Sequence, residues 1–355
     1  MWMRPGSWSL TDQACASTLK RFGAQAWGSG QAGKDILHRK KVDMDIRRVA
    51  CVGAGLIGQG WATLFASKGF DVILQDITDP VLEKSLKGVI SNLKFLEAHN
   101  LLAPGEADAA VRRIKTTTSM GQAAHDADYV QESVPDNYDA KRQVFKTLDA
   151  TAPEYAILAS SSSGLLMTEV QKVTSRPERC VLVHPCLPVH LIPLVEIVGG
   201  QQTSLEAVTI ARDLMNQLGK TPVILKREVS GYIVNRLQAA ILREAIDLVD
   251  KGVASPEEVD RAFCFGIGLR DPILGPFLRV HLTGDGIERF IKNYSQSYHY
   301  RWQTMESWTS IPPSAAEAVI KGVREMEVVQ TRPLEEIKSW RDQMLVKILK
   351  VISKG

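Results

Sequence analysis

Cysteine is scarce in this sequence, and none of the five cysteines forms a CxxC pair. A scattered, odd number of cysteines is typical of free thiols and argues against a disulfide framework, so we expect a cytoplasmic protein. Long apolar runs are missing as well. None approaches the roughly 18 residues that a membrane-spanning helix needs, so we expect no membrane segment.

A strong charge of either sign is also absent. The net charge is only +3 over 355 residues, which gives no support for a nucleic-acid partner, because such partners usually select clustered Lys and Arg. Hydrophobic residues make up 45% and charged residues 23%, as in ordinary globular proteins. The length suffices for two domains.

The first 43 residues lack a sustained period of 2 or 3.6 and end in the basic run at 38–41. They contain no continuous apolar stretch of the kind a secretory signal needs. An organellar transit peptide is the alternative, since acidic residues are few. We favour an over-long start, with the functional chain beginning at Met44. Deletion of residues 1–43 should then leave activity intact, and loss of soluble, active protein would refute this interpretation.

From Ile46 onward, short apolar runs alternate with helical patterns, which predicts an α/β domain with a parallel sheet covered on both faces. The predicted strands lie at 49–52, 72–74, 129–130, 156–159, 180–183, 194–198 and 223–225. After Lys226 the apolar residues recur at helical spacing only, and no convincing strand follows. We therefore predict a Rossmann-type domain at 44–228 and an all-helical domain at 229–355.

A GxGxxG motif follows the first predicted strand. Its residues are Gly53, Gly55, Leu56, Ile57 and Gly58, with Ala54 between the first two glycines. A strand precedes this motif, a helix follows it, and Asp76 closes the next strand, which together are typical of a dinucleotide site. Gly53 permits the tight turn, Gly55 lets the backbone approach a pyrophosphate, and Gly58 allows close helix packing. A glycine-rich turn without a ligand is the alternative.

Asp76 indicates which dinucleotide would bind. Its carboxylate would accept hydrogen bonds from the adenosine ribose hydroxyls and would repel a 2′-phosphate. The cofactor is therefore predicted to be NAD and not NADP.

One histidine and one glutamate interrupt neighbouring apolar strands. His184 ends the first of them, and Glu196 lies inside the second, where an unpaired carboxylate is costly. A neutral imidazole can take an alcohol proton as hydride leaves the same carbon, and a carboxylate would stabilise the imidazolium that forms. From these residues alone, a core histidine and an edge-strand glutamate remain an equal alternative.

Two further polar residues are candidates for substrate contact. Ser163 ends a serine run after the strand at 156–159, where open α/β sheets bind ligands, although such a run is also common in polar loops. Asn235 lies on an apolar helix, where it could donate to a substrate or only complete the packing. We expect no metal, because the spacing of His184, Cys186 and His190 matches no usual zinc pattern.

Several long segments together resemble the 3-hydroxyacyl-CoA dehydrogenase superfamily, and within it the lambda-crystallin (L-gulonate 3-dehydrogenase) branch. They are GAGLIGQGWATLFASKGFDVILQD, VQESVPDNYDAKRQVF, ASSSSGLL, HPCLPVHLIPLVEIV and SGYIVNRLQAAILREAIDLVDKGVASPEEVD. The resemblance extends from about Ile46 to about Tyr294. It implies a Rossmann-type domain followed by a helical domain that forms a homodimer.

The resemblance also implies roles for individual residues. It makes His184 the general base, Glu196 its orienting partner, and Ser163 and Asn235 the substrate contacts. Glu132 and Lys141 match positions along the nicotinamide half of the cofactor, and Arg270 matches an arginine of the small-substrate branch. We expect Arg270 to bind the substrate carboxylate as a bidentate fork, with a solvated surface arginine as the alternative.

The implied activity is NAD-dependent oxidation of the 3-hydroxyl of a small, L-gulonate-like hydroxy acid. Leu187, Val189 and Asp271 depart from the family pattern, and Leu187 removes a polar group, which favours a less hydroxylated substrate than gulonate. The alternatives are 3-hydroxybutyrate, carnitine-like hydroxy acids and short 3-hydroxyacyl-CoA thioesters. From other classes, a hydratase or lyase would need no dinucleotide site, and a non-enzymatic, crystallin-like NAD-binding protein would need no base–carboxylate pair.

Overall fold

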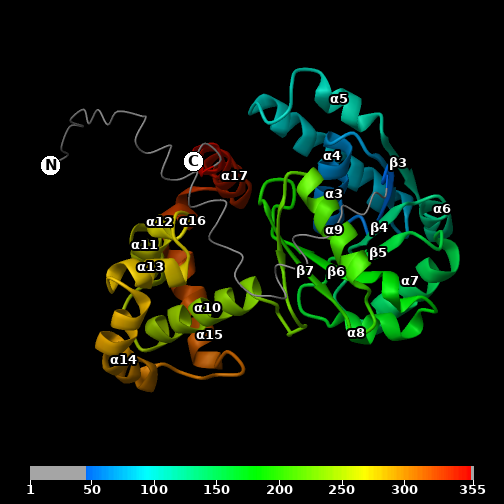
Figure 1. Cartoon of the computed structure of the whole chain (residues 1–355). Helices are drawn as coiled ribbons and strands as arrows, with labels where there is room; N and C mark the ends of the chain where they lie inside the picture. Colours follow the sequence, from blue (N-terminus) through cyan, green and yellow to red (C-terminus); the bar gives the residue numbers. More distant parts are fainter. Residues whose placement is uncertain (1–44, 353–355) are drawn as a thin grey trace, which may run out of the picture. The chain divides into compact units, whose positions relative to one another are not determined.

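The computed structural model describes residues 45–352, which fall into two compact units. The first unit contains the described residues 45–239, and the second contains the described residues 240–352 (Figure 1). The interpretation of residues 1–43 as an over-long start concerns a segment outside the described residues.

An eight-stranded sheet forms the centre of the first unit, in the order β3-β2-β1-β4-β5-β6-β7-β8 (Figure 1). The strands are β1 (Arg48–Val52), β2 (Asp71–Gln75), β3 (Ile114–Thr117), β4 (Tyr129–Glu132), β5 (Ile157–Ser160), β6 (Cys180–Pro185), β7 (Leu194–Gly199) and β8 (Thr221–Ile224). The chain builds one side of the sheet from β1 to β3 and then returns to place β4 beside β1. Strand order therefore reverses between β1 and β4, which is where open α/β sheets bind nucleotides.

The sheet is parallel only as far as β6. β7 pairs with β6 in antiparallel register, and β8 runs parallel to β7. A short connection at 186–193 joins β6 to β7 without a helix, and a parallel crossover needs a dozen or more residues. The expectation of a wholly parallel sheet is therefore corrected for its last two strands.

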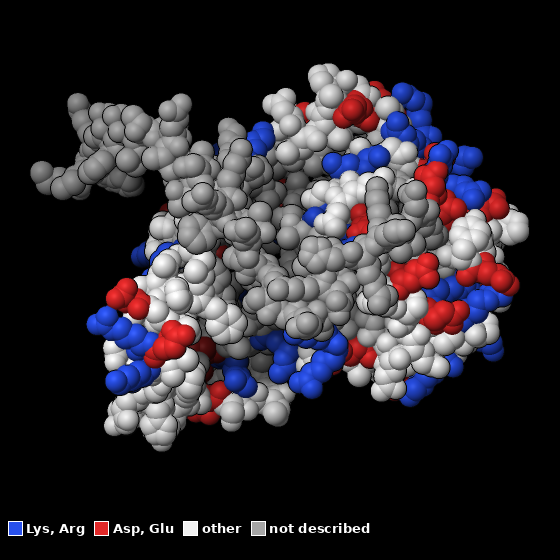
Figure 2. Space-filling model, in the orientation of Figure 1, with Lys and Arg blue, Asp and Glu red and all other residues white. Residues whose placement is uncertain are grey.

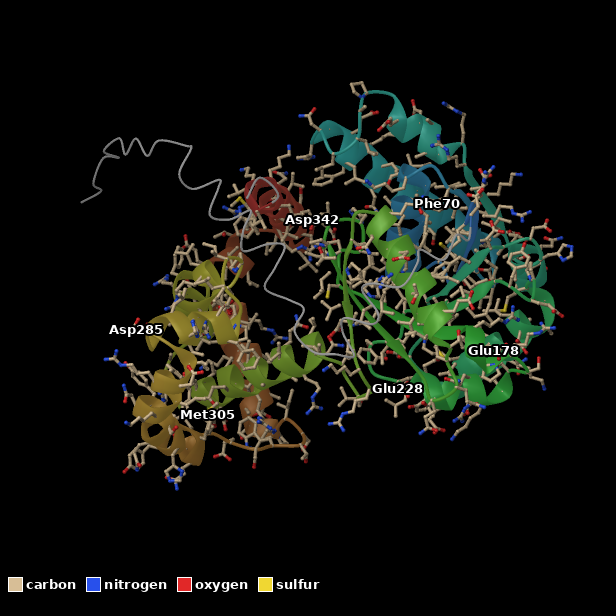
Figure 3. The ribbon with its side chains drawn as sticks, in the orientation of Figure 1. Phe70, Glu178, Glu228, Asp285, Met305 and Asp342 are labelled. Carbon is tan, nitrogen blue, oxygen red and sulfur yellow. The ribbon has the colours of Figure 1, made fainter. Side chains whose placement is uncertain are left out.

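Helices cover both faces of this sheet. They are α3 (Leu56–Ser67), α4 (Asp79–Ala98), α5 (Glu106–Val111), α6 (Met120–Ala124), α7 (Tyr138–Thr151), α8 (Met167–Val170) and α9 (Leu205–Gln217), with short turns η1 (Gln171–Val173) and η2 (Pro177–Arg179). One apolar cluster contains Trp61, Phe65 and Phe70, and the other contains Phe145 and Leu148. Phe70, labelled in Figure 3, precedes β2 and packs edge-on against Phe65. A core on each face explains why the strands read as continuous apolar runs.

β3 was missed by the sequence patterns. Its residues, IKTT, are partly exposed at the sheet edge and therefore show no apolar run.

Glu228, labelled in Figure 3, follows β8 and accepts a hydrogen bond from the Thr168 amide of α8 at 3.1 Å. This contact holds the segment that leads into α10 (Val234–Asp250).

The described part of the second unit contains helices and no strand. They are the end of α10, then α11 (Pro256–Ala262), η3 (Phe263–Ile267), α12 (Gly268–Arg270), α13 (Pro276–Thr283), α14 (Ile287–Thr304), α15 (Pro313–Glu325), α16 (Glu327–Thr331) and α17 (Leu334–Ile352). The units divide within α10, after Ala239. The sequence composition changes earlier, near 228.

The surface carries charges of both signs. Figure 2 shows acidic and basic side chains interspersed over the visible face of the sheet unit. Within residues 45–352, no helix combines the length and apolarity that crossing a bilayer would require.

Candidate active site

The glycine-rich loop begins where β1 ends. Gly53 has a φ of +91°, a left-handed conformation that favours glycine. Gly58 lies so close to this turn that a Cβ on it would be 1.8 Å from the Gly53 carbonyl oxygen. The two glycines therefore bring the start of α3 directly against the end of β1.

Gly55 is the N-cap of α3, and no side chain caps this helix. A Cβ built on Gly55 would meet nothing within 4 Å, so a ligand can approach the backbone here. The amides of Leu56 and Ile57 belong to the first turn, whose N–H groups lack intrahelical acceptors and attract anions. These features fit a pyrophosphate group.

Asp76 lies next to this loop. One carboxylate oxygen accepts the Ala54 amide at 2.7 Å, and the other accepts the Ile77 amide at 2.7 Å. Ile77 and Leu56 are apolar yet exposed, which suits contact with a flat adenosine group. The residues that follow β1 and β2 and those that begin α3 therefore fit a dinucleotide.

His184 and Glu196 are brought together by the β6–β7 register, in which they are directly opposite. His184 Nδ1 lies 2.8 Å from Glu196 Oε2, and both side chains are buried. Since an ionised carboxylate can only accept, Nδ1 carries the proton. In a neutral imidazole this leaves Nε2 as a bare nitrogen able to accept a proton.

The start of α10 holds the other oxygen of Glu196. Oε1 accepts the amides of Ile233 at 2.8 Å and Val234 at 3.1 Å. Burial by itself would raise the pKa of Glu196, but the hydrogen bonds from His184 and these amides outweigh it and hold the pKa below its usual value. Glu196 is therefore ionised at neutral pH.

Tyr232 links three parts of this site, and the sequence analysis did not identify it. Its ring centroid lies 5.2 Å from that of His184, and its hydroxyl donates to the Leu165 carbonyl at 2.6 Å. Its φ of +49° turns the chain so that the next two amides reach Glu196. Only the apolar context of SGYIVNRL was visible in the sequence.

Ser163 and Asn235 also lie together. Asn235 Nδ2 donates to the Ser163 carbonyl oxygen at 2.8 Å. The exposed Ser163 hydroxyl donates to Asp136 Oδ2 at 2.6 Å, and its amide donates to the same oxygen at 2.8 Å. Burial would raise the pKa of Asp136, but hydrogen bonds from Ser163 and Ser162 and the charge of Lys141 lower it. Asp136 is a second residue that the sequence analysis missed.

Glu132 and Lys141 form a buried ion pair. Lys141 Nζ lies 2.7 Å from Glu132 Oε1 and 3.5 Å from Asp136 Oδ1, while Ser160 donates to Glu132 Oε2 at 2.7 Å. Lys141 also donates to the Val134 carbonyl at 3.1 Å. Through the Val134 carbonyl and Asp136, the pair thus holds the loop after β4. The expected place of Glu132 and Lys141 along the nicotinamide half of the cofactor stays a prediction.

Lys220 is a third residue without a sequence signal. It is buried, and its Nζ donates to the carbonyls of Val189 and of Ile192, the latter at 2.6 Å. Burial lowers the pKa of Lys220 to about 7. Through its two hydrogen bonds, Lys220 holds the connection that joins β6 to β7 after His184.

Arg270 and Asp271 belong to the helical unit. Arg270 is exposed and donates through Nε to the Gly266 carbonyl at 3.1 Å, while Asp271 pairs with Arg279 at 2.9 Å. The role of Arg270 in substrate binding stays a prediction. Across residues 45–352, no three His, Cys, Asp or Glu side chains are grouped as a metal site requires.

Comparison with protein families covers both units. Residues 48–229 match the 3-hydroxyacyl-CoA dehydrogenase, NAD binding domain, and residues 231–314 match the 3-hydroxyacyl-CoA dehydrogenase, C-terminal domain.

Individual relatives agree with these matches. The chain is 37% identical over 313 residues to an L-carnitine dehydrogenase of a Pseudomonas species, covering 86% of this chain and 94% of that protein. It is 33% identical over 309 residues to an L-carnitine dehydrogenase of Oceanobacillus iheyensis, covering 86% and 98%. A similar solved structure is an NAD+-dependent 5-formyl-3-hydroxy-2-methylpyridine 4-carboxylic acid 5-dehydrogenase, with a TM-score of 0.75, 28% identity and coverage of 87% and 99%. Another is the (S)-3-hydroxybutyryl-CoA dehydrogenase of Ralstonia eutropha, with a TM-score of 0.59, 30% identity and coverage of 82% and 96%.

The fold, the glycine-rich loop and these relatives lead to one enzyme class. The protein is an NAD-dependent dehydrogenase that acts on a CH–OH group. The chain belongs to the 3-hydroxyacyl-CoA dehydrogenase family.

Proposed function

We propose that the protein oxidises the 3-hydroxyl of a small, carnitine-like hydroxy acid to the ketone. The observation that carries this proposal is the buried His184–Glu196 pair, which leaves Nε2 of His184 as a proton acceptor. The L-carnitine dehydrogenases among the relatives support this substrate class over an L-gulonate-like one.

His184 is assigned the proton transfer. NAD bound at the glycine-rich loop would supply the acceptor for the hydride that leaves the carbinol carbon. Nε2 of His184 accepts the hydroxyl proton at the same time, so that the positive charge formed on the imidazolium faces the ionised Glu196. Glu196 stays ionised throughout, because its other oxygen remains bonded to the amides of Ile233 and Val234.

Asn235 and Ser163 are assigned to the substrate oxygens. An asparagine amide has two N–H donors, and Asn235 uses one on the Ser163 carbonyl, which leaves one for the substrate. The Ser163 hydroxyl is exposed and held by Asp136. Together they would fix the orientation of the carbon that loses hydride.

The charge beside Ser163 favours a cationic substrate. Within residues 45–352 one cation, Lys141, pairs with the carboxylates of both Glu132 and Asp136, so that one of these two negative charges has no cation of its own. This charge would attract a quaternary ammonium group and would disfavour the phosphates of a CoA thioester. We assign the substrate carboxylate to Arg270, for the bidentate geometry that a guanidinium offers.

The test is NADH formation, followed by absorbance, with L-carnitine, L-gulonate, 3-hydroxybutyrate and 3-hydroxybutyryl-CoA. The proposal expects the highest kcat/KM for L-carnitine and a raised KM for carboxylate substrates in Arg270→Ala. A highest kcat/KM for the CoA thioester would refute the carnitine-like substrate, and an unchanged KM would remove Arg270 from the site.

We further propose that the helical unit self-associates as a homodimer. Its exposed large apolar side chains include Phe265, Leu269, Ile273, Phe277 and Leu282. Within the described residues 240–352, by contrast, the buried hydrophobic residues are only Ile246, Ala315 and Val346. Such exposed apolar surface usually marks an interface. Sedimentation should give twice the monomer mass, and Phe277→Glu should lower it. A monomeric wild type would refute this proposal.

The four cysteines within the described residues are free thiols, which supports a cytoplasmic location.

A further inference from the structure

A buried group of hydroxyls and amides lies behind the glycine-rich loop. Ser161 Oγ accepts the indole N–H of Trp61 at 3.0 Å and the side-chain amide of Gln131 at 2.7 Å. Its third contact is with Ser133 Oγ at 2.9 Å. None of these three contacts belongs to the catalytic steps above.

The orientation of Gln131 is fixed by its neighbours. Its Nε2 also lies 3.4 Å from the Val183 carbonyl, which can only accept, and its Oε1 accepts the Tyr129 hydroxyl at 2.9 Å. The Trp61 indole can only donate. The Trp61 indole and the Gln131 amide are therefore both donors, and they use the two lone pairs of the Ser161 oxygen.

The remaining contact of Ser161 must then be made with its own proton. A hydroxyl has one proton and two lone pairs, so Ser161 donates to Ser133 and not the reverse. The proton of the Ser133 hydroxyl stays free to donate, since within residues 45–352 Ser133 Oγ has no other hydrogen-bond partner. Ser133 is half-buried, so part of this residue is open to a ligand.

Ser133 lies at the point where the strand order reverses. It directly follows β4, its amide donates to the Val52 carbonyl of β1 at 2.7 Å, and its carbonyl lies against Gly53. Asp76 lies on the β2 side of this point, where it would hold the adenosine half of a dinucleotide. The other half would then have to extend toward the β4 side, where Ser133 lies.

We propose that Ser133 is a cofactor-binding residue that donates a hydrogen bond to an oxygen of the nicotinamide nucleoside, either a ribose oxygen or the carboxamide carbonyl. Ser161 sets the direction of this donor through Trp61 and Gln131. The proposal rests on the NAD site and does not depend on which hydroxy acid is the substrate.

The test is calorimetric binding of NAD, ADP-ribose and ADP to wild type and Ser133→Ala, without substrate. ADP carries only the adenosine half, so its Kd should not change, whereas the Kd of NAD should rise about fivefold, the usual effect of one lost neutral hydrogen bond. A parallel loss for ADP-ribose would identify the ribose as acceptor, and an unchanged ADP-ribose affinity would identify the carboxamide.

Ser67→Ala is the matched control, because this serine lies on α3 and, within residues 45–352, its hydroxyl bonds only the Leu64 carbonyl. It should leave all three Kd values unchanged. If Ser133→Ala weakened ADP and NAD equally, or weakened neither, the proposal would be overturned. Trp61→Phe tests the orienting chain: its effect on NAD affinity should shrink in the Ser133→Ala background, and strict additivity would contradict the chain.

Discussion

His184 and Glu196 are twelve residues apart in sequence and directly opposite each other in the β6–β7 pairing. The 2.8 Å contact between Nδ1 and Oε2 uses one imidazole nitrogen and leaves the other for chemistry. Because Glu196 also accepts two amides from the start of α10, the orientation of the histidine depends on a segment beyond the sheet.

Glu196→Gln should lower kcat by roughly 10²- to 10⁴-fold, since a glutamine can donate to Nδ1 and so place the imidazole proton on the reacting nitrogen. Steady-state rates with saturating NAD measure this. The Kd of NAD should stay unchanged, because Glu196 does not lie at the glycine-rich loop. A kcat within a factor of three of the wild type would refute the orienting role.

Tyr232→Phe removes the hydroxyl, which donates to the Leu165 carbonyl and also interacts with Ser162, and keeps the ring beside His184. We expect a loss of about 1 kcal/mol in unfolding free energy and a few-fold fall in kcat, because the loop that contains Ser163 and Leu165 is less firmly held. Urea unfolding and initial rates measure the two effects. Tyr294→Phe, on an exposed residue of α14 whose hydroxyl has no hydrogen-bond partner within residues 45–352, is the control and should change neither value. Loss of stability with an unaltered kcat would make Tyr232 a purely structural residue.

Lys220→Met tests a dependence of stability on pH. The folded-state pKa of Lys220 is about 7, below the ordinary value of 10.5. Between these pH values the unfolded chain binds the proton and the folded chain does not, so wild-type stability should rise with pH, by up to about 1.4 kcal/mol per pH unit. Well below pH 7 Lys220 is protonated in both states, so its contribution to the free energy of unfolding no longer changes with pH.

Urea unfolding of wild type and Lys220→Met at pH 6.5, 8 and 9.5 measures this slope. The unfolding free energy of the wild type minus that of Lys220→Met should increase as the pH rises. The same comparison with Lys84→Met, at an exposed lysine, should show no such increase. Parallel curves for wild type and Lys220→Met would contradict the lowered pKa.

Asp76→Asn should reduce discrimination between the two dinucleotides. Removal of the carboxylate weakens the ribose contact and the repulsion of a 2′-phosphate, so kcat/KM for NAD should fall roughly tenfold or more while that for NADP rises. Asp79→Asn, at the exposed start of α4, is the control. An unchanged NAD to NADP ratio in Asp76→Asn would refute the assignment.

Much of this site was visible in the sequence because it depends on local patterns. The glycines, Asp76, His184 and Glu196 each begin, end or interrupt an apolar strand, and strand ends on one edge of a sheet lie near each other. The contact of His184 with Glu196 required in addition that β7 reverse direction, which the short connection after β6 causes.

The remaining residues were missed for physical reasons. Asp136, Lys220 and Tyr232 act through contacts with segments distant in sequence, and no periodicity reports such contacts. Ser133 is one hydroxyl among many in the sequence. Only the two fixed donors to Ser161, Trp61 and Gln131, indicate that the hydroxyl proton of Ser133 is free.

The most direct measurement is the initial rate of NADH formation from L-carnitine by wild type and His184→Gln, side by side, at saturating NAD. We predict turnover by the wild type and a rate lower by at least 10²-fold in His184→Gln, with the Kd of NAD preserved. Equal rates for the two proteins would contradict the role of His184. Absence of turnover in a wild type that binds NAD would contradict the carnitine-like substrate.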